Sequence, residues 1–161
     1  MKTTDDKHSK RKEHQKDSLH TTEDATQQMV SEIVEYCRKG SKWGVRAILD
    51  TVKEQQRGFL LNQHDRFGDT ALTAAASGGH NGLLQYLLEI PGVDPNITTE
   101  GTRFTPLILA AAHGNSQIVD NLIKLSAINP EIKDINQMTA AEEATYSGHL
   151  EISTMITNRK I

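Results

Sequence analysis

The chain has 161 residues, the usual size of one folded domain, and a formal net charge of −3. No apolar run approaches the ~18 residues of a membrane span, and the N-terminus has no apolar leader, so we expect a soluble intracellular protein without membrane contact. We place it in the cytoplasm, with the nucleus as the alternative. The single cysteine excludes an internal disulfide and fits a reducing compartment.

Residues 1–26 differ in composition from the rest of the chain. They are rich in Lys, Asp, His and Thr, and their only branched apolar side chain is Leu19. Such a segment cannot bury enough surface to offset its ordering entropy, so we predict a disordered tail. Its basic run, Lys7–Lys12, has two interpretations. One is a nuclear-import or anion-binding signal, and the other, favoured because acids lie directly on both sides of the run, is a solvated end.

A helix is expected to begin near Thr22. Its apolar face would consist of Met29, Val30, Ile33, Val34 and Cys37. Gly40 would end it, and a second apolar face follows at Val45, Ile48 and Leu49. The stretch 51–59 is polar and is interpreted as an insertion, which Trp43 is expected to cover.

Three later segments share an eleven-residue phrase. They begin at Thr70, Thr105 and Thr139, at spacings of 35 and 34 residues. Each phrase has a threonine able to cap a helix, a run rich in small residues, and a glycine that can end the helix with a positive φ. Residues 33–40 align with the phrase as a degenerate first copy. Such a period indicates a solenoid of stacked helix pairs, which offers an extended surface in place of a closed pocket.

The phrase resembles the ankyrin repeat, whose first helix opens on T-P-L-H-x-A and is followed by Gly-His. The matching residues are Thr105-Pro106-Leu107, the alanine pairs Ala75-Ala76 and Ala110-Ala111, and the closing pairs Gly79-His80 and Gly148-His149. The resemblance implies an all-α ankyrin-repeat solenoid of helix-turn-helix units joined by β-hairpin loops. It covers residues 27–161, as a degenerate capping repeat (27–61), two repeats (62–96 and 97–131) and a terminal capping repeat (132–161).

Residue types that serve catalysis or metal binding stand at positions that the repeat already explains. Cys37 occupies a small, buried position of the phrase, so we expect a packed thiol. His80 and His149 lie two repeats apart, too far to share a zinc ion, and are expected to brace the loops between helices. Glu142 and Glu143 are helix neighbours that point in different directions and make no acid/base pair. We therefore expect no enzyme, no cofactor and no metal site.

In the ankyrin family, partners usually meet the hairpin tips and the inner helix face. Carried onto this chain, the resemblance implies ten candidate partner-binding residues. They are Arg66, Phe67, Arg103, Phe104, Ile135 and Asn136 on the tips, and Leu109, His113, Glu143 and Tyr146 on the inner helices. The sequence leaves open whether each Phe anchors a partner or folds back onto the neighbouring hairpin. Arg103 and Gln137 replace the glycine found at Gly68, so those two turns are expected to be built differently.

The resemblance implies a protein–protein interaction module. We expect a monomeric adaptor that binds, scaffolds or inhibits another protein through its concave surface. The acidic body offers no basic patch for nucleic acid. Two alternatives stay open: a nuclear regulator that uses the basic tail, and an effector delivered into a host cell by an intracellular pathogen, a setting in which the same architecture occurs.

Overall fold

The computed structural model describes the backbone of residues 6–159 and the side chains of residues 22–159. Within these ranges the chain forms helices and turns, without a strand. The helices are α1 (Asp6–Arg38), α2 (Lys42–Leu49), α3 (Glu54–Leu61), α4 (Ala71–Ser77), α5 (Asn81–Leu88), α6 (Pro106–Ala112), α7 (Ser116–Ile123), α8 (Ala140–Tyr146) and α9 (Leu150–Thr157).

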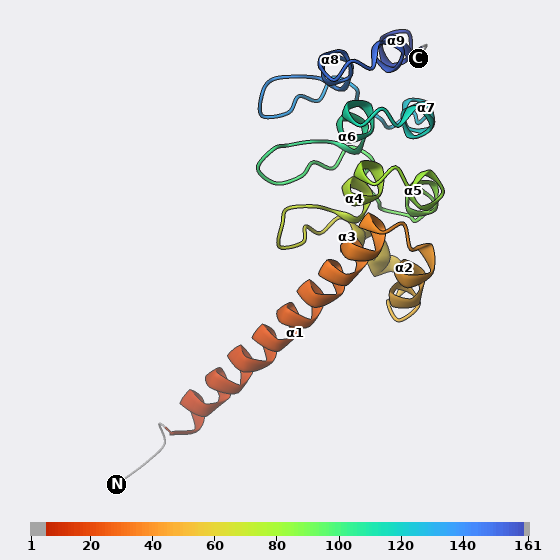
Figure 1. Ribbon diagram of the computed structural model, residues 1–161. Helices are drawn as coiled ribbons and strands as arrows, with labels where there is room; N and C mark the ends of the chain where they lie inside the picture. Colours follow the sequence, from red (N-terminus) through yellow and green to blue (C-terminus); the bar gives the residue numbers. More distant parts are fainter. Residues whose placement is uncertain (1–5, 160–161) are drawn as a thin grey trace.

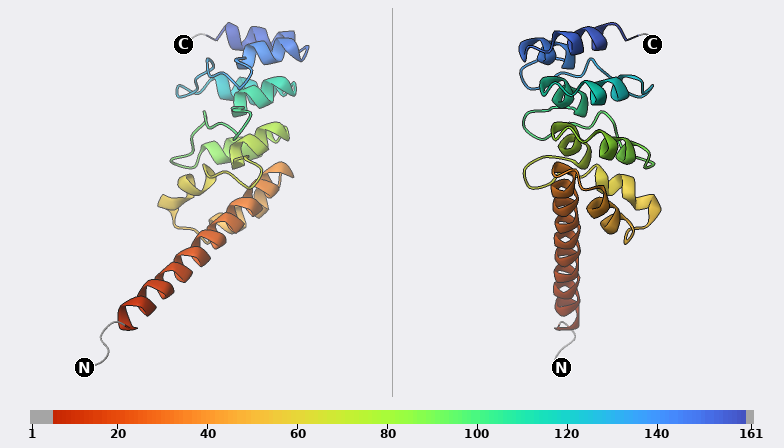
Figure 2. Two further views of the ribbon diagram at one scale, coloured as in Figure 1. Left: turned by 90° about the vertical axis from the view of Figure 1, so that its left-hand side faces the viewer. Right: turned by 45° about the vertical axis from the view of Figure 1, so that its right-hand side comes forward.

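The helices pair into four units that stack in chain order (Figure 1). The end of α1 with α4, α6 and α8 makes an inner row, and α2, α5, α7 and α9 make an outer row (Figures 1 and 2). A long loop precedes each of α4, α6 and α8 and projects past the inner row. The stretch interpreted as an insertion contains α3, which packs beside the first unit. The predicted all-α solenoid is confirmed.

The inner helices begin at threonines because these side chains satisfy backbone donors that have no partner inside the helix. The hydroxyl oxygens of Thr70, Thr105 and Thr139 accept hydrogen bonds from the third amide of α4, α6 and α8, at 3.3, 3.1 and 3.4 Å. Pro106 opens α6, where the missing N–H costs nothing. Seven-residue helices are too short to be stable alone, so their stability comes from packing against neighbours.

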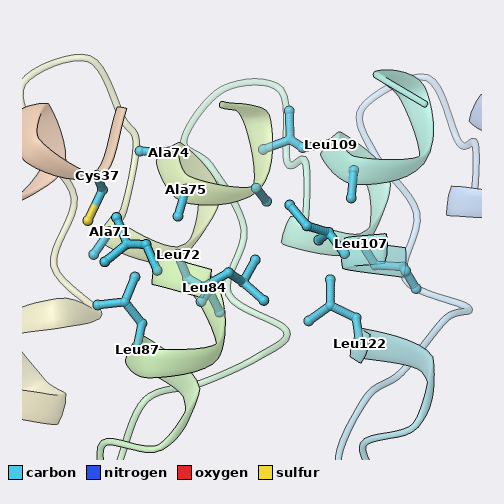
Figure 3. Close-up of a cluster of buried hydrophobic side chains, with 14 of the residues drawn as sticks. Cys37, Ala71, Leu72, Ala74, Ala75, Leu84, Leu87, Leu107, Leu109 and Leu122 are labelled. Atoms are coloured by element: carbon cyan, nitrogen blue, oxygen red, sulfur yellow. The ribbon is translucent and has the colours of Figure 1, made fainter. Parts of the chain in front are cut away.

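The core is a continuous seam between the two rows (Figure 3). Small side chains line the inner helices, where one unit meets the next: Ala75, Ala76, Ala110 and Ala111 are completely buried. Leucines from the outer helices, among them Leu84, Leu87 and Leu122, fill the space behind them. Alanine at these contacts lets consecutive helix pairs approach closely, and the leucines supply most of the buried apolar volume.

Polar side chains also connect successive units at their edges. The Asn62 amide donates to the Gly92 carbonyl at 2.8 Å and accepts from the Asp94 N–H at 3.0 Å. One unit later, Asn96 makes the same pair of bonds to Ala127 and Asn129, at 2.8 and 2.7 Å. These bonds hold successive units together at a fixed spacing.

The Gly-His positions join the units at the opposite edge. His80 Nε2 lies 3.0 Å from the Arg38 carbonyl, at the end of the preceding inner helix. Its ring occupies the space that a Cβ on Gly40 would need, and the His149 ring lies over Gly114 in the same way. The bracing role expected of these histidines is therefore what the structure shows.

The first helix begins earlier than expected. α1 runs as one helix from Asp6, sixteen residues before the start expected near Thr22. Residues 6–26 contain neither Gly nor Pro, so nothing in the sequence interrupts a helix there. This part of α1 projects away from the stacked units (Figures 1 and 2). The side chains of Lys7–Lys12, and residues 1–5 and 160–161 altogether, lie outside the described part.

The tips of the second and fourth units have the same construction, although Gln137 replaces glycine in the fourth, whereas the tip of the third unit is one residue longer and has a second positive φ at Gly101. Gly68 has a φ of 83°, and its counterparts Arg103 and Gln137 adopt φ values of 59° and 65°. The N–H of each donates to the carbonyl of the residue that opens its turn, Asp65, Thr99 or Asp134. The expectation of differently built turns was wrong at Gln137, which adopts the left-handed conformation at an energetic cost of about 1–2 kcal/mol, and is confirmed at Arg103, whose turn is one residue longer.

We expect Ala110→Leu to destabilise the protein by about 1–3 kcal/mol, the usual cost of inserting extra methylenes into a packed core. Ala110 is completely buried. Urea denaturation followed by circular dichroism would measure the change. Gln85→Leu, at an exposed position of α5, is the control. Equal stabilities of the Ala110→Leu variant and the native chain would contradict the placement of this alanine at a tight contact.

We expect Gln137→Gly to stabilise the protein by about 1 kcal/mol, because glycine adopts the positive φ without strain. Gln137 is exposed, so little packing is lost. The converse change, Gly68→Ala, should destabilise, since its Cβ would lie 2.8 Å from that of Glu100. Thermal unfolding of both variants tests the pair, and a lower melting temperature for Gln137→Gly would refute the strain at this turn.

Candidate partner-binding surface

The two Arg-Phe tips have different environments. The Phe67 side chain is 68% exposed, and the Arg66 guanidinium lies 4.8 Å from the centre of its ring. Phe104 is half-buried and packs against the core, whereas Arg103 beside it is exposed. The alternatives left open by the sequence are therefore resolved differently: Phe67 is available to a partner, and Phe104 folds back.

The fourth unit presents a second exposed group. Ile135 and Asn136 are exposed on its tip, and Tyr146, at the end of α8, is 82% exposed. The Ile135 N–H donates to the Thr102 carbonyl at 3.0 Å, as the Glu100 N–H does to the Gly68 carbonyl at 2.9 Å. These bonds link successive tips, so their side chains project from one connected row of loops.

Not every candidate on the inner helices reaches the surface. Leu109 and Glu143 are buried, which differs from the exposed face expected from the register. Both lie near the middle of their helices. His113, one helical turn after Leu109, is exposed, and its Nδ1 lies 2.8 Å from the Leu109 carbonyl. The accessible part of the inner row is thus the C-terminal end of each helix.

A hollow of about 390 Å³ lies between the end of α1 and the first tip. Residues of both signs line it, including Glu35, Lys39 and Arg66, together with the rings of Tyr36 and Phe67. The hollow is open and mixed in character. Glu35 and Tyr36 were not among the residues selected from the sequence, because the first copy of the phrase is too degenerate to identify its exposed positions.

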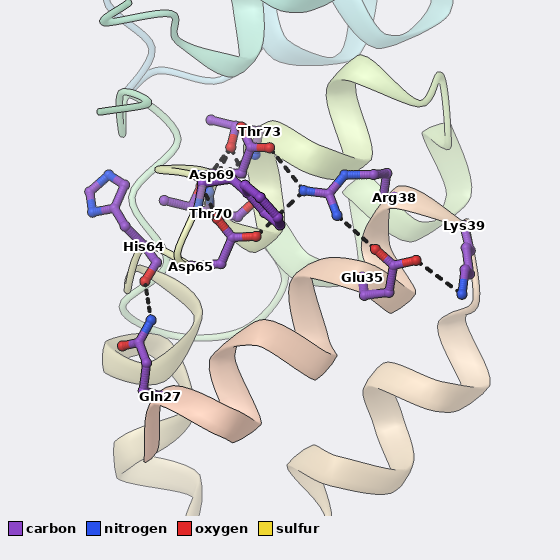
Figure 4. A network of polar contacts seen from close by, with 10 residues as sticks. Gln27, Glu35, Arg38, Lys39, His64, Asp65, Asp69, Thr70 and Thr73 are labelled. Carbon is purple, nitrogen blue, oxygen red and sulfur yellow. Dashed lines mark hydrogen bonds and ion pairs between the residues drawn. The ribbon is translucent and has the colours of Figure 1, made fainter. Parts of the chain in front are cut away.

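Arg38 connects this hollow to the second unit (Figure 4). Its guanidinium donates to Glu35 at 2.7 Å, to Asp69 at 3.0 Å and to Asp65 at 3.4 Å. Partial burial lowers the pKa of Arg38, but the bonds to Asp69, Glu35 and Asp65 outweigh it and raise the pKa above its ordinary value. The charged Arg38 therefore fixes the first tip against α1.

Asp134 on the last tip has no comparable partner. It is completely buried, and its Oδ2 has no hydrogen-bond donor among the described groups while Glu143 is ionised. Glu143 lies beside it, and the pKa of Glu143 is raised by burial, by a hydrogen bond that only the protonated carboxyl can donate to Asp134, and by repulsion between the two charges. Two carboxyls buried side by side favour the protonated form of one of them, so this pair weakens the fold when both are ionised.

Residues with catalytic or metal-binding potential are not assembled into a reactive site in the described part of the chain. Burial raises the pKa of Cys37 to about 12, which keeps the thiol protonated and unreactive. Among the described residues, no three His, Cys, Asp or Glu side chains gather as metal ligands. None of the described helices combines the length and the apolar character required to cross a bilayer.

Trp43 was expected to cover the insertion, and this was wrong. Its side chain is 80% exposed on α2. The equivalent positions of the later outer helices are Gly82, Gln117 and Glu151, which are all exposed. Trp43 therefore occupies a position of the repeat that faces solvent. Phe59 on α3 is exposed too.

Glu142 and Glu143 should affect stability in opposite directions. Because its folded-state pKa is raised above 4.5, Glu143 contributes stability that is present below this pH and is lost as the pH rises through the raised value. We therefore expect Glu143→Gln to raise the melting temperature at pH 7 more than at pH 4. Melting curves of the variant and the native chain between pH 4 and 8 would measure this.

Glu142 is the matched control, because its carboxylate accepts from the Thr139 N–H at 2.7 Å and its pKa is lowered by that bond. Its contribution is present above 4.5 and is lost as the pH falls through the lowered value. Glu142→Gln should lower the melting temperature at pH 7. If Glu143→Gln changed the melting temperature equally at every pH, the interaction between the carboxyls of Glu143 and Asp134 would be contradicted.

Comparison with known proteins agrees with this geometry. A family model described as ankyrin repeats in three copies matches residues 36–134 and 80–161. Dauer abnormal formation protein 25 of Caenorhabditis elegans is 33% identical over 138 residues, which is 86% of this chain and 33% of that protein. Glycerophosphocholine phosphodiesterase gde1 of Schizosaccharomyces pombe is 33% identical over 96 residues, or 60% of this chain and 8% of that protein.

The human SMC5-SMC6 complex localization factor protein 1 is 28% identical over 89 residues, 55% of this chain and 8% of that protein. The chain thus spans a third or less of each of these curated relatives. What the matches share is the repeat, in proteins with otherwise different names. Together with the stacked helix pairs and their projecting loops, the family match shows that this chain belongs to the ankyrin-repeat family.

Proposed function

We propose that this protein is an adaptor that binds, scaffolds or inhibits a partner protein through its loop tips and the exposed ends of its inner helices. Ankyrin repeats are in general protein–protein interaction modules. The observation that carries the proposal is the exposed Phe67, stacked with Arg66, on a tip held in place by the Arg38 ion pairs. Aromatic and Arg side chains dominate binding energy at interfaces, and a fixed tip limits the entropy lost on binding.

Further exposed side chains extend the proposed surface along the stack. Arg103, Ile135 and Asn136 continue the row of tips, and His113 and Tyr146 lie at the ends of the inner helices. The open hollow beside Phe67 gives a partner side chain a place to insert. The surface is extended and mixed in polarity, as adaptor interfaces of ordinary size are.

We expect Arg66→Ala with Phe67→Ala to weaken binding of a captured partner by more than about 2 kcal/mol, roughly thirtyfold in Kd. A partner would be isolated with the full chain as bait, and its affinity for each variant measured by calorimetry. Helicity should not change, because Arg66 and Phe67 are exposed and lie outside the helices.

The control is Gln85→Ala with Asp120→Ala on the outer helices α5 and α7, where binding should change little. Asp120 pairs with Lys124 on its own helix, so its loss disturbs no contact between units. Loss of binding in the outer-helix variant, with the tip variant unaffected, would overturn the proposed surface.

A further inference from the structure

Two arginines on neighbouring tips present guanidinium groups that nothing in the described part of the chain engages. Arg66 lies on the tip of the second unit and Arg103 on the tip of the third, and both side chains are exposed. Among the described residues neither guanidinium makes a hydrogen bond or an ion pair, and Arg66 contacts only the ring of Phe67. The other four arginines with described side chains all meet a carboxylate or carbonyl oxygen: Arg38, Arg46, Arg57 and Arg159.

The carboxylates beside Arg66 are already engaged by other groups. Asp65 is buried, and its Oδ1 accepts from the N–H groups of Phe67 and Asp69, at 2.8 and 3.0 Å. The Nη2 of Arg38 lies 3.4 Å from Asp65 Oδ2 and 3.0 Å from Asp69 Oδ2. Arg38 thus neutralises these aspartates from the inner side, and Arg66 is the charge that this tip presents to solvent.

The tip of the third unit presents Arg103 from a strained turn. Its φ of 59° is a conformation that glycine adopts without strain, as Gly68 does on the tip before it, so the arginine is kept at an energetic cost. Strain retained at an exposed turn favours a role for the side chain. The acid on this tip, Glu100, lies 3.7 Å from His64 Nδ1 and makes no ion pair with Arg103.

The two tips are held side by side. The Glu100 N–H donates to the Gly68 carbonyl at 2.9 Å, and the two loops project on the same side of the stack (Figure 1). The exposed residues that end the inner helices behind them, Ser77 and His113, bring no carboxylate. The two free guanidinium groups therefore stand along one connected edge.

We propose that the tips of the second and third units bind an extended acidic segment of the partner protein, with one carboxylate at Arg66 and another at Arg103. This inference rests on the proposed function and names the chemistry of the partner. A guanidinium binds a carboxylate through two parallel N–H bonds, which fixes the direction of approach. An apolar side chain between the two acids would pack against the exposed ring of Phe67.

The charge of the whole protein does not oppose this arrangement at physiological salt. Residues 17–161 have a net charge of −6, but exposed charges farther apart than about 8 Å are largely screened, so the charges on the tips dominate. Glu32, on the α1 side of the hollow, is exposed and accepts a hydrogen bond from Gln28 at 2.8 Å. The acidic segment is therefore expected to run from Arg66 toward Arg103, away from α1.

The test uses a fluorescein-labelled peptide of sequence Gly-Glu-Glu-Leu-Glu-Glu-Gly as the probe, with the full chain titrated in and binding followed by anisotropy. Two further peptides carry Gln or Lys in place of every Glu. We expect the acidic peptide to bind about tenfold more tightly than the Gln peptide, and the Lys peptide to bind no better than the Gln peptide. Added salt should remove this preference, because both ion pairs are exposed.

Arg66→Gln and Arg103→Gln should each weaken binding of the acidic peptide about threefold, and together they should abolish its preference over the Gln peptide. Arg103→Gln keeps a residue type that Gln137 shows in the left-handed conformation, so the tip should fold. The matched control is Arg46→Gln with Lys124→Gln, which removes the same charge from the outer helices, where each cation pairs with an acid of its own helix or helix end. Its binding should be unchanged.

Removal of the competing acid should act in the opposite direction. We expect Glu100→Gln to strengthen binding of the acidic peptide about twofold to threefold, because Glu100 is exposed on the same tip as Arg103. Glu89→Gln, at the exposed end of the outer helix α5, makes the same change in net charge and should have no effect.

Equal binding of the acidic and Gln peptides, or equal losses in the tip and outer-helix double variants, would overturn the inference. Tighter binding of a labelled oligouridine than of the acidic peptide, with the same dependence on both arginines, would assign the tips to phosphates and overturn it as well. Since the peptides require no captured partner, their failure leaves the adaptor proposal to its own test, in which Phe67→Ala alone retains both arginines.

Discussion

The close contact between consecutive helix pairs is the constraint on which the rest of the structure depends. A seven-residue helix such as α4 or α6 cannot persist alone, so each unit is stable only while its neighbours bury its apolar faces. Completely buried alanines, Ala75 and Ala110 among them, set the distance of approach. Because that distance recurs from unit to unit, equivalent polar side chains can form the same hydrogen bonds across successive gaps.

The repeated spacing explains why single side chains can join the units. Asn62 and Asn96 each span one gap with the same two bonds, and His80 reaches the end of the preceding inner helix. Arg38 acts across the same gap, from the end of α1 to the first tip. Where the sequence places Ala112 in the position of Arg38, Asp134 has no guanidinium beside it. In a regular scaffold a single substitution thus removes an ion pair between two units.

The same regularity shapes the surface available for binding. The middle of the inner helices is buried, so Leu109 and Glu143 do not reach the surface, whereas Phe67 and Tyr146 are exposed. The open hollow beside α1 is lined by residues from two units and therefore exists only when they are stacked. A rigid row of tips with a few exposed aromatic rings is suited to holding another protein without a closed cavity.

The sequence by itself determined the repeat, the helix starts at Thr70, Thr105 and Thr139, the buried place of Cys37 and the bracing role of His80, because these follow from local spacing and helix-end chemistry. Tertiary structure decided what depends on contacts between units: that Phe104 packs while Phe67 is exposed, and that Asp134 is left without the cation that Asp65 has. It also decided that Arg103 and Gln137 accept a positive φ, since the strain is offset by packing elsewhere in the stack. In a solenoid, whether a side chain is buried depends on which part of the next unit packs against it. Local sequence signals do not contain that information.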